Sequence, residues 1–157
     1  MTKPTPLWHV AALKNVHLRD LQAHNTVITE AALNSPGGIH LHYEAIGADD
    51  PQVSQVTVTV KLSLHLGQAD SAPDSAPLFI IARYEAVYSR PASFRVVPKD
   101  LQDFAQHNAM LNVWPQWREL TRSLFRQMDL SLPPIPHFRV PGAVQPPPSP
   151  TQAPPTR

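Results

Sequence analysis

The sequence predicts an α+β fold in which a long amphipathic helix lies on one face of an antiparallel sheet. Four segments before residue 90 have strand patterns, and after Pro98 the apolar residues follow the period of a helix. Strands that come first and a helix that follows are typical of the α+β class. With 157 residues and 42% hydrophobic content, the chain suits one domain with one modest core.

The clearest strand pattern runs over residues 56–66. Its even positions are all apolar, and its odd positions are Thr57, Thr59, Lys61, Ser63 and His65. This strict period of two predicts a half-buried antiparallel strand with one wet face. Residues 39–45 repeat the pattern in the opposite parity, so that His40, His42 and Glu44 point outward.

Two further strands are predicted. Residues 78–89 are apolar on both faces at their start, so we expect that part to be covered on both sides. Residues 10–21 form a weaker strand, because their apolar parity slips near Lys14 and indicates a bulge. The composition of residues 67–77 predicts a loop between the third and fourth strands.

An amphipathic helix is predicted over residues 115–128. Its apolar positions are Trp117, Leu120, Leu124, Phe125 and Met128, and Arg118, Arg122 and Arg126 form a row on another face. Pro115 fits the start of a helix, with Asn112 before it as a possible cap. A shorter helix over residues 99–110 could precede it.

The proline content predicts the domain limits. Ten of the 19 prolines lie between Pro133 and Pro155. Proline removes backbone donors and the end of the chain has little apolar content, so we expect residues 143–157 to be an extended, disordered tail. Residues 8–142 are then the folded domain, and residues 1–7 an N-terminal tail.

Charge and composition exclude several function classes. A net charge of +1 gives no basic excess for nucleic acid, and the chain contains no cysteine for thiol chemistry. No apolar run is long enough for a signal peptide or a membrane span. We therefore expect a cytoplasmic protein that neither binds nucleic acid nor inserts into a membrane.

No catalytic or cofactor motif is present. The sequence lacks Gly-x-Ser-x-Gly, a phosphate-binding glycine loop and His-Glu-x-x-His, so we expect no enzyme activity and no cofactor. His40, His42 and Glu44 have a ligand-like spacing on one strand face, but a third histidine is not tied to them, so we expect no metal site. The arginine row could hold phosphate or an acidic client, although a solvated helix face is the simpler interpretation.

Four short segments resemble the SecB family of export chaperones. The family's first strand is similar to residues 14–20, Lys-Asn-Val-His-Leu-Arg-Asp. A later strand of the family is similar to residues 56–60, Val-Thr-Val-Thr-Val. Asn-Val-Trp-Pro-Gln-Trp-Arg-Glu at 112–119 resembles its helix entry, and Met-Asp-Leu-Ser-Leu-Pro-Pro-Ile-Pro at 128–136 its segment after the helix. They come in the family's order across residues 8 to 140.

The resemblance implies a four-stranded antiparallel sheet with a long helix, assembled as a dimer of dimers. It also implies an ATP-independent holdase that binds unfolded polypeptide, and a single client such as an antitoxin suits a divergent copy. The family docks on the translocation ATPase SecA through carboxylates, whose places are taken here by Asn15, Arg19 and, nearby, Ile81. Docking on SecA is therefore not expected. The family's second helix has no counterpart in the Pro-rich tail.

Apolar side chains that are not buried in the core are the candidates for client binding. We predict this role for Phe79, Tyr84, Tyr88, Trp114, Trp117, Leu130, Leu132 and Ile135. Leu120, Leu124, Phe125 and Met128 are predicted at an oligomer interface. The alternative function is an adaptor that keeps the fold and joins a defined complex through its tail and sheet edge.

Overall fold

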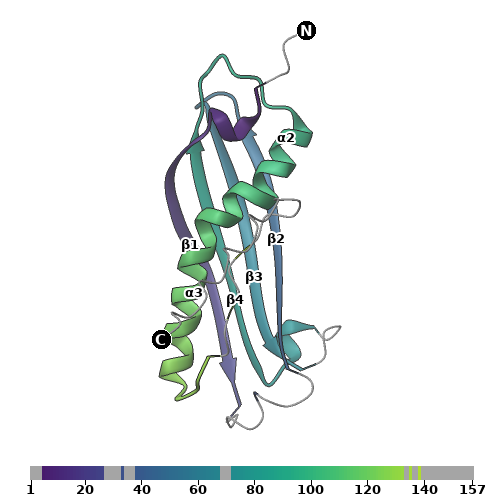
Figure 1. The fold of residues 1–157 in the computed structure, drawn as a ribbon, viewed down its shortest axis with the longest axis vertical. Coiled ribbons are helices and arrows are strands. Elements are labelled where there is room, and N and C mark those ends of the chain that lie inside the picture. The colour runs from purple at the N-terminus through teal and green to yellow at the C-terminus, as the bar shows by residue number, and fades with distance from the viewer. Residues whose placement is uncertain are drawn as a thin grey trace, which may run out of the picture.

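The computed structural model of the protein describes residues 5–26, 33, 38–67, 72–132, 135 and 138. Four strands form one antiparallel sheet in the order β1-β4-β3-β2, and a run of helices crosses one face of it obliquely (Figure 1). The strands are β1 (Ala12–Asn25), β2 (Ile39–Asp50), β3 (Gln55–Leu66) and β4 (Leu78–Ser89). The predicted fold class is confirmed. The Pro-rich segment 143–157 lies outside the described residues.

The two central strands match their predicted limits closely. In β3 and β4 the even-numbered residues are buried beneath the helices, which defines the helix face of the sheet. The odd-numbered residues point to the far face. On that face Thr57, Thr59 and Lys61 are at least partly exposed, as predicted, but Ser63 and His65 are buried. The solvent-exposed part of the far face of β3 therefore ends at Lys61.

Strand β2 continues five residues beyond its predicted end at Ala45. The apolar alternation stops at Gly47, where a side chain would collide with the helix. A Cβ on Gly47 would lie 2.8 Å from Leu101 Cδ1. Glycine thus allows the first helix to approach β2, and the strand goes on without an apolar residue at that position.

Strand β1 contains two bulges. Its pairing with β4 shifts register between Leu13 and Asn15, which confirms the bulge predicted near Lys14, and again between Leu18 and Asp20. Each bulge restores the parity of the apolar residues. As a result Leu13, Leu18 and Leu21 pair with Tyr88, Tyr84 and Ala82 and share the helix face.

The helical run begins at Pro98, one residue before the shorter helix predicted over residues 99–110. It comprises α2 (Pro98–Asp103), a π-helical segment η3 (Phe104–Ala109) and α3 (Met110–Gln127). The predicted start at Pro115 and the predicted cap at Asn112 are wrong, because both residues lie inside α3. Pro98 takes the first-turn position instead. Asn112 donates a hydrogen bond from Nδ2 to the Tyr88 hydroxyl over 3.0 Å.

The remaining helical turns are short. The turn η1 (Leu7–His9) precedes β1, and η2 (Pro73–Ser75) precedes β4. Leu7 is fully buried in the core.

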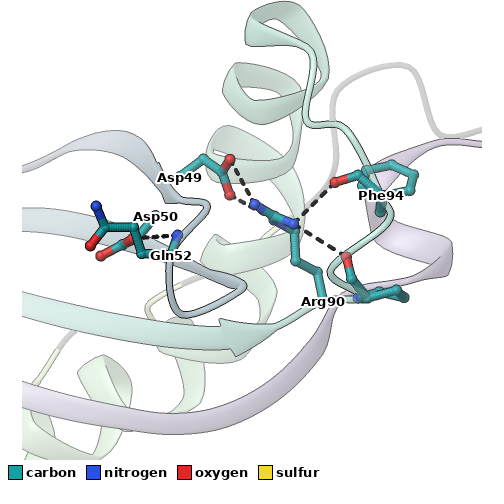
Figure 2. A network of polar contacts seen from close by, with 6 residues as sticks. Asp49, Asp50, Gln52, Arg90 and Phe94 are labelled. Atoms are coloured by element: carbon teal, nitrogen blue, oxygen red, sulfur yellow. Dashed lines mark hydrogen bonds and ion pairs between the residues drawn. The ribbon is translucent and has the colours of Figure 1, made fainter.

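A partly buried ion pair joins β2 to the connection that enters α2 (Figure 2). Arg90 donates from Nε to Asp49 Oδ1 over 2.7 Å and from Nη2 to Asp49 Oδ2 over 2.9 Å. Its Nη1 donates to the carbonyls of Pro91 and Phe94. The guanidinium thereby holds the end of β2 and the chain leaving β4 in one arrangement.

Candidate functional site

The end of α3 turns the chain back along the helix (Figure 1). Asp129 has a φ of +55°, the left-handed conformation typical of the residue that follows a helix. The N–H of Leu130 donates to the Phe125 carbonyl over 2.9 Å, and the N–H of Asp129 to the Arg126 carbonyl over 3.1 Å. These are the two bonds of a Schellman motif. After the turn the chain runs back far enough for the Phe138 ring to lie 5.5 Å from that of Trp114.

A pocket of about 410 Å³ lies between the helix and this returning segment. The arginine row, Arg118, Arg122 and Arg126, forms one side, and the returning segment forms the other with its apolar side chains Leu130, Leu132 and Ile135 and with Ser131. Leu130 is nearly buried, whereas Leu132 and Ile135 are half-buried. We call this space the arginine–leucine pocket. It offers apolar contact and positive charge to the same ligand.

Three of the eight predicted client-binding residues therefore lie together in this pocket, namely Leu130, Leu132 and Ile135. Phe79 is half-buried on the far face, where its ring stacks on that of His24 with centroids 5.4 Å apart. Tyr84, Tyr88, Trp114 and Trp117 are buried in the core. They face the helix–sheet interface, so this conformation does not offer them to a client.

The two buried tyrosines predict a loss of stability at alkaline pH. Burial raises the pKa of Tyr84 from 10.0 to about 12. It also raises the pKa of Tyr88, against a smaller lowering by the hydrogen bond from Asn112. Since the unfolded chain loses these protons first, the stability present below pH 10 falls as the pH rises toward 12. Tyr84 contributes on the order of 2–3 kcal/mol to this fall.

Urea unfolding between pH 8 and 11.5 tests this expectation. Tyr84→Phe should flatten the alkaline decline, whereas Tyr43→Phe, at an exposed tyrosine, should leave it unchanged. An equally steep decline in the Tyr84→Phe variant would contradict the assignment.

A second, more apolar pocket of about 350 Å³ lies near the start of α3. It is lined by Trp8, Asp103, His107, Asn108 and Leu111, and the side chains of Trp8 and Leu111 are exposed. The sequence did not indicate this pocket, because Trp8 lies in η1, far along the chain from the helical residues that complete the lining. The helix predicted over residues 99–110 contains Asp103, His107 and Asn108, but no local pattern relates them to Trp8.

No protein-family model and no curated protein matches the sequence. A search of solved structures finds the Rv1957 SecB-like chaperone of Mycobacterium tuberculosis, in complex with a ChAD peptide from the Rv1956 HigA1 antitoxin. The TM-score is 0.65 over 85% of this chain and 91% of that chain, at 15% sequence identity. The chain has a SecB-like fold. The resemblance in four short segments thus led to the correct architecture.

The predicted oligomer interface falls on the side of α3 nearest the sheet. Within the SecB-like fold Leu120, Leu124 and Met128 are half-buried, and Phe125 is fully buried against the core. More exposed apolar side chains lie on the edge strand, where Leu13, Leu18 and Leu21 are 45%, 45% and 38% exposed. The sequence did not single out these leucines, because an alternation interrupted by two bulges does not show that they share one face.

His40, His42 and His65 lie close together at one end of the far face of the SecB-like fold. The ring of His65 lies 5.5 Å from that of His40 and 5.3 Å from that of His42, in a stacked arrangement with the latter. In the described part of the chain, no group of three His, Asp or Glu side chains is placed to hold a metal ion. Across the same residues, no helix is long and apolar enough to span a membrane.

Proposed function

We propose that this protein is an ATP-independent holdase that binds unfolded polypeptide, with the arginine–leucine pocket as a client site. The observation that carries the proposal is this pocket, where apolar side chains face solvent beside a row of arginines on a SecB-like fold. Burying one large apolar side chain of a client is worth about 1.5–3 kcal/mol. A pocket of this size can take such a side chain without any chemical step.

The second pocket supports binding of an extended client. It lies near the first turn of α3, while the arginine–leucine pocket lies toward the last turns. The Cα atoms of Leu111 and Arg126 are separated by about 22 Å at 1.5 Å per residue, which roughly seven residues of extended chain would span. Two separated apolar pockets allow a holdase to bind a client without demanding one sequence.

We further propose that the protein assembles as a homo-oligomer of the dimer-of-dimers kind. Strand β1 is an edge strand, and its helix face carries the exposed leucines Leu13, Leu18 and Leu21. Unpaired edges with apolar side chains favour association with another chain.

We do not expect the protein to dock on SecA through an acidic sheet. On β1, Arg19 donates to Glu85 of β4 over 2.6 Å, which pairs a carboxylate of the far face with a cation. Farther along the same face, Asp20 pairs with Arg83 and Glu44 with Lys61 in the strand register. Mixed charges of this kind do not form the negative surface that steers a basic partner.

The client could be a single protein of the antitoxin kind, as the structural neighbour binds an antitoxin peptide. Aggregation assays with several unrelated denatured proteins test both the activity and its breadth. We expect near-stoichiometric suppression for a general holdase and suppression of one partner for a dedicated one. An adaptor would suppress aggregation of none, and that result would overturn the proposal.

Serine substitutions test whether the pocket is the site. Leu132→Ser with Ile135→Ser should weaken client binding roughly tenfold, since two partly exposed apolar contacts are lost. Val53→Ser is the matched control, because Val53 is exposed at the β2–β3 turn and lines neither pocket. Circular dichroism establishes that each variant is folded. Equal loss of holding in the control would remove the pocket from the proposal.

A further inference from the structure

We propose that the arginine–leucine pocket selects client segments in which acidic and apolar residues alternate. This inference rests on the proposed holdase function and specifies the chemistry of its client. Among the residues that the structure describes, the three charged side chains that line the pocket are all arginines, and the apolar side chains face them from the returning segment. A ligand in this space therefore meets positive charge on one side and hydrocarbon on the other.

The spacing of the arginines matches that of an extended peptide. Arg118, Arg122 and Arg126 are four residues apart, so their Cα atoms rise by about 6 Å from one to the next. In an extended chain, side chains on the same face are two residues apart, or about 6.6 Å. Carboxylates at alternate positions of a client can therefore each meet one guanidinium. The residues between them point the other way, toward Leu130, Leu132 and Ile135.

Arg122 is able to change partners. Arg122 donates to Glu119 over 3.1 Å, and both side chains of this pair are largely exposed. Exposed pairs of this kind contribute at most about 1 kcal/mol, so a client carboxylate can replace Glu119 at little cost. Partial burial in the pocket strengthens each new charge-assisted hydrogen bond relative to one in water.

An acidic polypeptide suits the pocket better than a nucleic acid. Rows of arginine also bind phosphate, but nucleic-acid binders extend such a row over a basic surface. Here the opposite wall is apolar, and the chain as a whole has a net charge of only +1. Acidic polypeptides and nucleic acids are both anions, and the leucines favour the anion that carries apolar side chains.

Fluorescence anisotropy with three labelled peptides of equal length tests the inference. Leu alternates with Glu in the first, with Gln in the second and with Lys in the third. We expect the Glu peptide to bind roughly tenfold more tightly than the Lys peptide at low salt, with the Gln peptide between them. The preference should shrink in about 0.5 M salt, where exposed charges are screened.

Charge reversal in the pocket supplies the matched variants. Arg122→Glu with Arg126→Glu should reverse the order of the Glu and Lys peptides. Arg95→Glu should preserve the order, because Arg95 is an exposed residue that precedes α2 at the other end of the helical run. Both variants are tested for folding by circular dichroism.

Three outcomes would overturn the inference: equal affinity for the Glu and Lys peptides, a preference that survives charge reversal, or displacement of the Glu peptide by a lower concentration of an oligonucleotide or of inorganic phosphate. Suppressed aggregation of unfolded proteins together with equal peptide affinities would refute the acidic preference and leave the holdase function intact. Absence of both suppression and peptide binding would refute the holdase function itself.

Discussion

An Asp49→Ala variant is expected to lose about 3 kcal/mol of unfolding free energy, or about 6–12 °C in Tm. The Arg90 side chain is only 3% exposed, and Asp49 is its charged partner in the pair. Removal of the carboxylate leaves a buried guanidinium without a counter-charge, which costs more than the pair itself contributes. The loss should also loosen the entry into α2, since Arg90 binds the carbonyls of Pro91 and Phe94.

Urea denaturation measures this loss of unfolding free energy, and two further variants serve as comparisons. Glu85→Ala breaks the more exposed pair with Arg19 and should cost less than about 1 kcal/mol. Asp49→Ala with Arg90→Met removes both charges and should be more stable than Asp49→Ala alone. A double variant that costs the sum of the two single variants would show that the two side chains are not coupled.

A Trp117→Ala variant is expected to lose about 3–5 kcal/mol of stability. Trp117 is fully buried between α3 and the sheet, so alanine would leave a large cavity in the centre of the core. Its indole Nε1 has no hydrogen-bond partner among the described residues. Trp117→Phe should therefore cost much less, because it retains an aromatic ring and removes an N–H that is buried unsatisfied.

Paired measurements separate the stability of Trp117 variants from client binding. Unfolding curves should rank the native protein close to Trp117→Phe and far above Trp117→Ala. At a temperature where all three proteins are folded, we expect them to hold clients equally, because the ring does not face solvent. A folded Trp117→Phe variant with impaired holding would show that clients reach the core and would restore Trp117 to the client site.

The sequence by itself determined the two central strands of the sheet. Strict alternation fixes the parity of β3, and the apolar run at its start locates β4, so the predicted and observed limits of these two strands nearly coincide. The alternation in β4 also indicated that Tyr84 and Tyr88 are buried, because they share the buried face with Ile80 and Ala86. Local periodicity succeeds here because side chains alternate between the two faces of a strand.

The limits of the helix were harder to predict. Proline is favoured in the first turn of a helix, and the sequence offers both Pro98 and Pro115 for that place. Pro115 cannot donate to the carbonyl of Leu111, and packing of α3 on the sheet outweighs this loss. Helix propensity alone could not show whether the packing of α3 on the sheet outweighs the hydrogen bond lost at Pro115.

Only the tertiary structure decided the candidate site. The sequence supplied the arginine row and, through the resemblance, the apolar residues after the helix, but as two unrelated features. A Schellman motif with Asp129 in the left-handed conformation, where glycine is usual, brings them together. Whether an arginine row is a solvated face or one wall of a pocket depends on what the chain places opposite it. That is a long-range contact, which the local pattern of a helix does not encode.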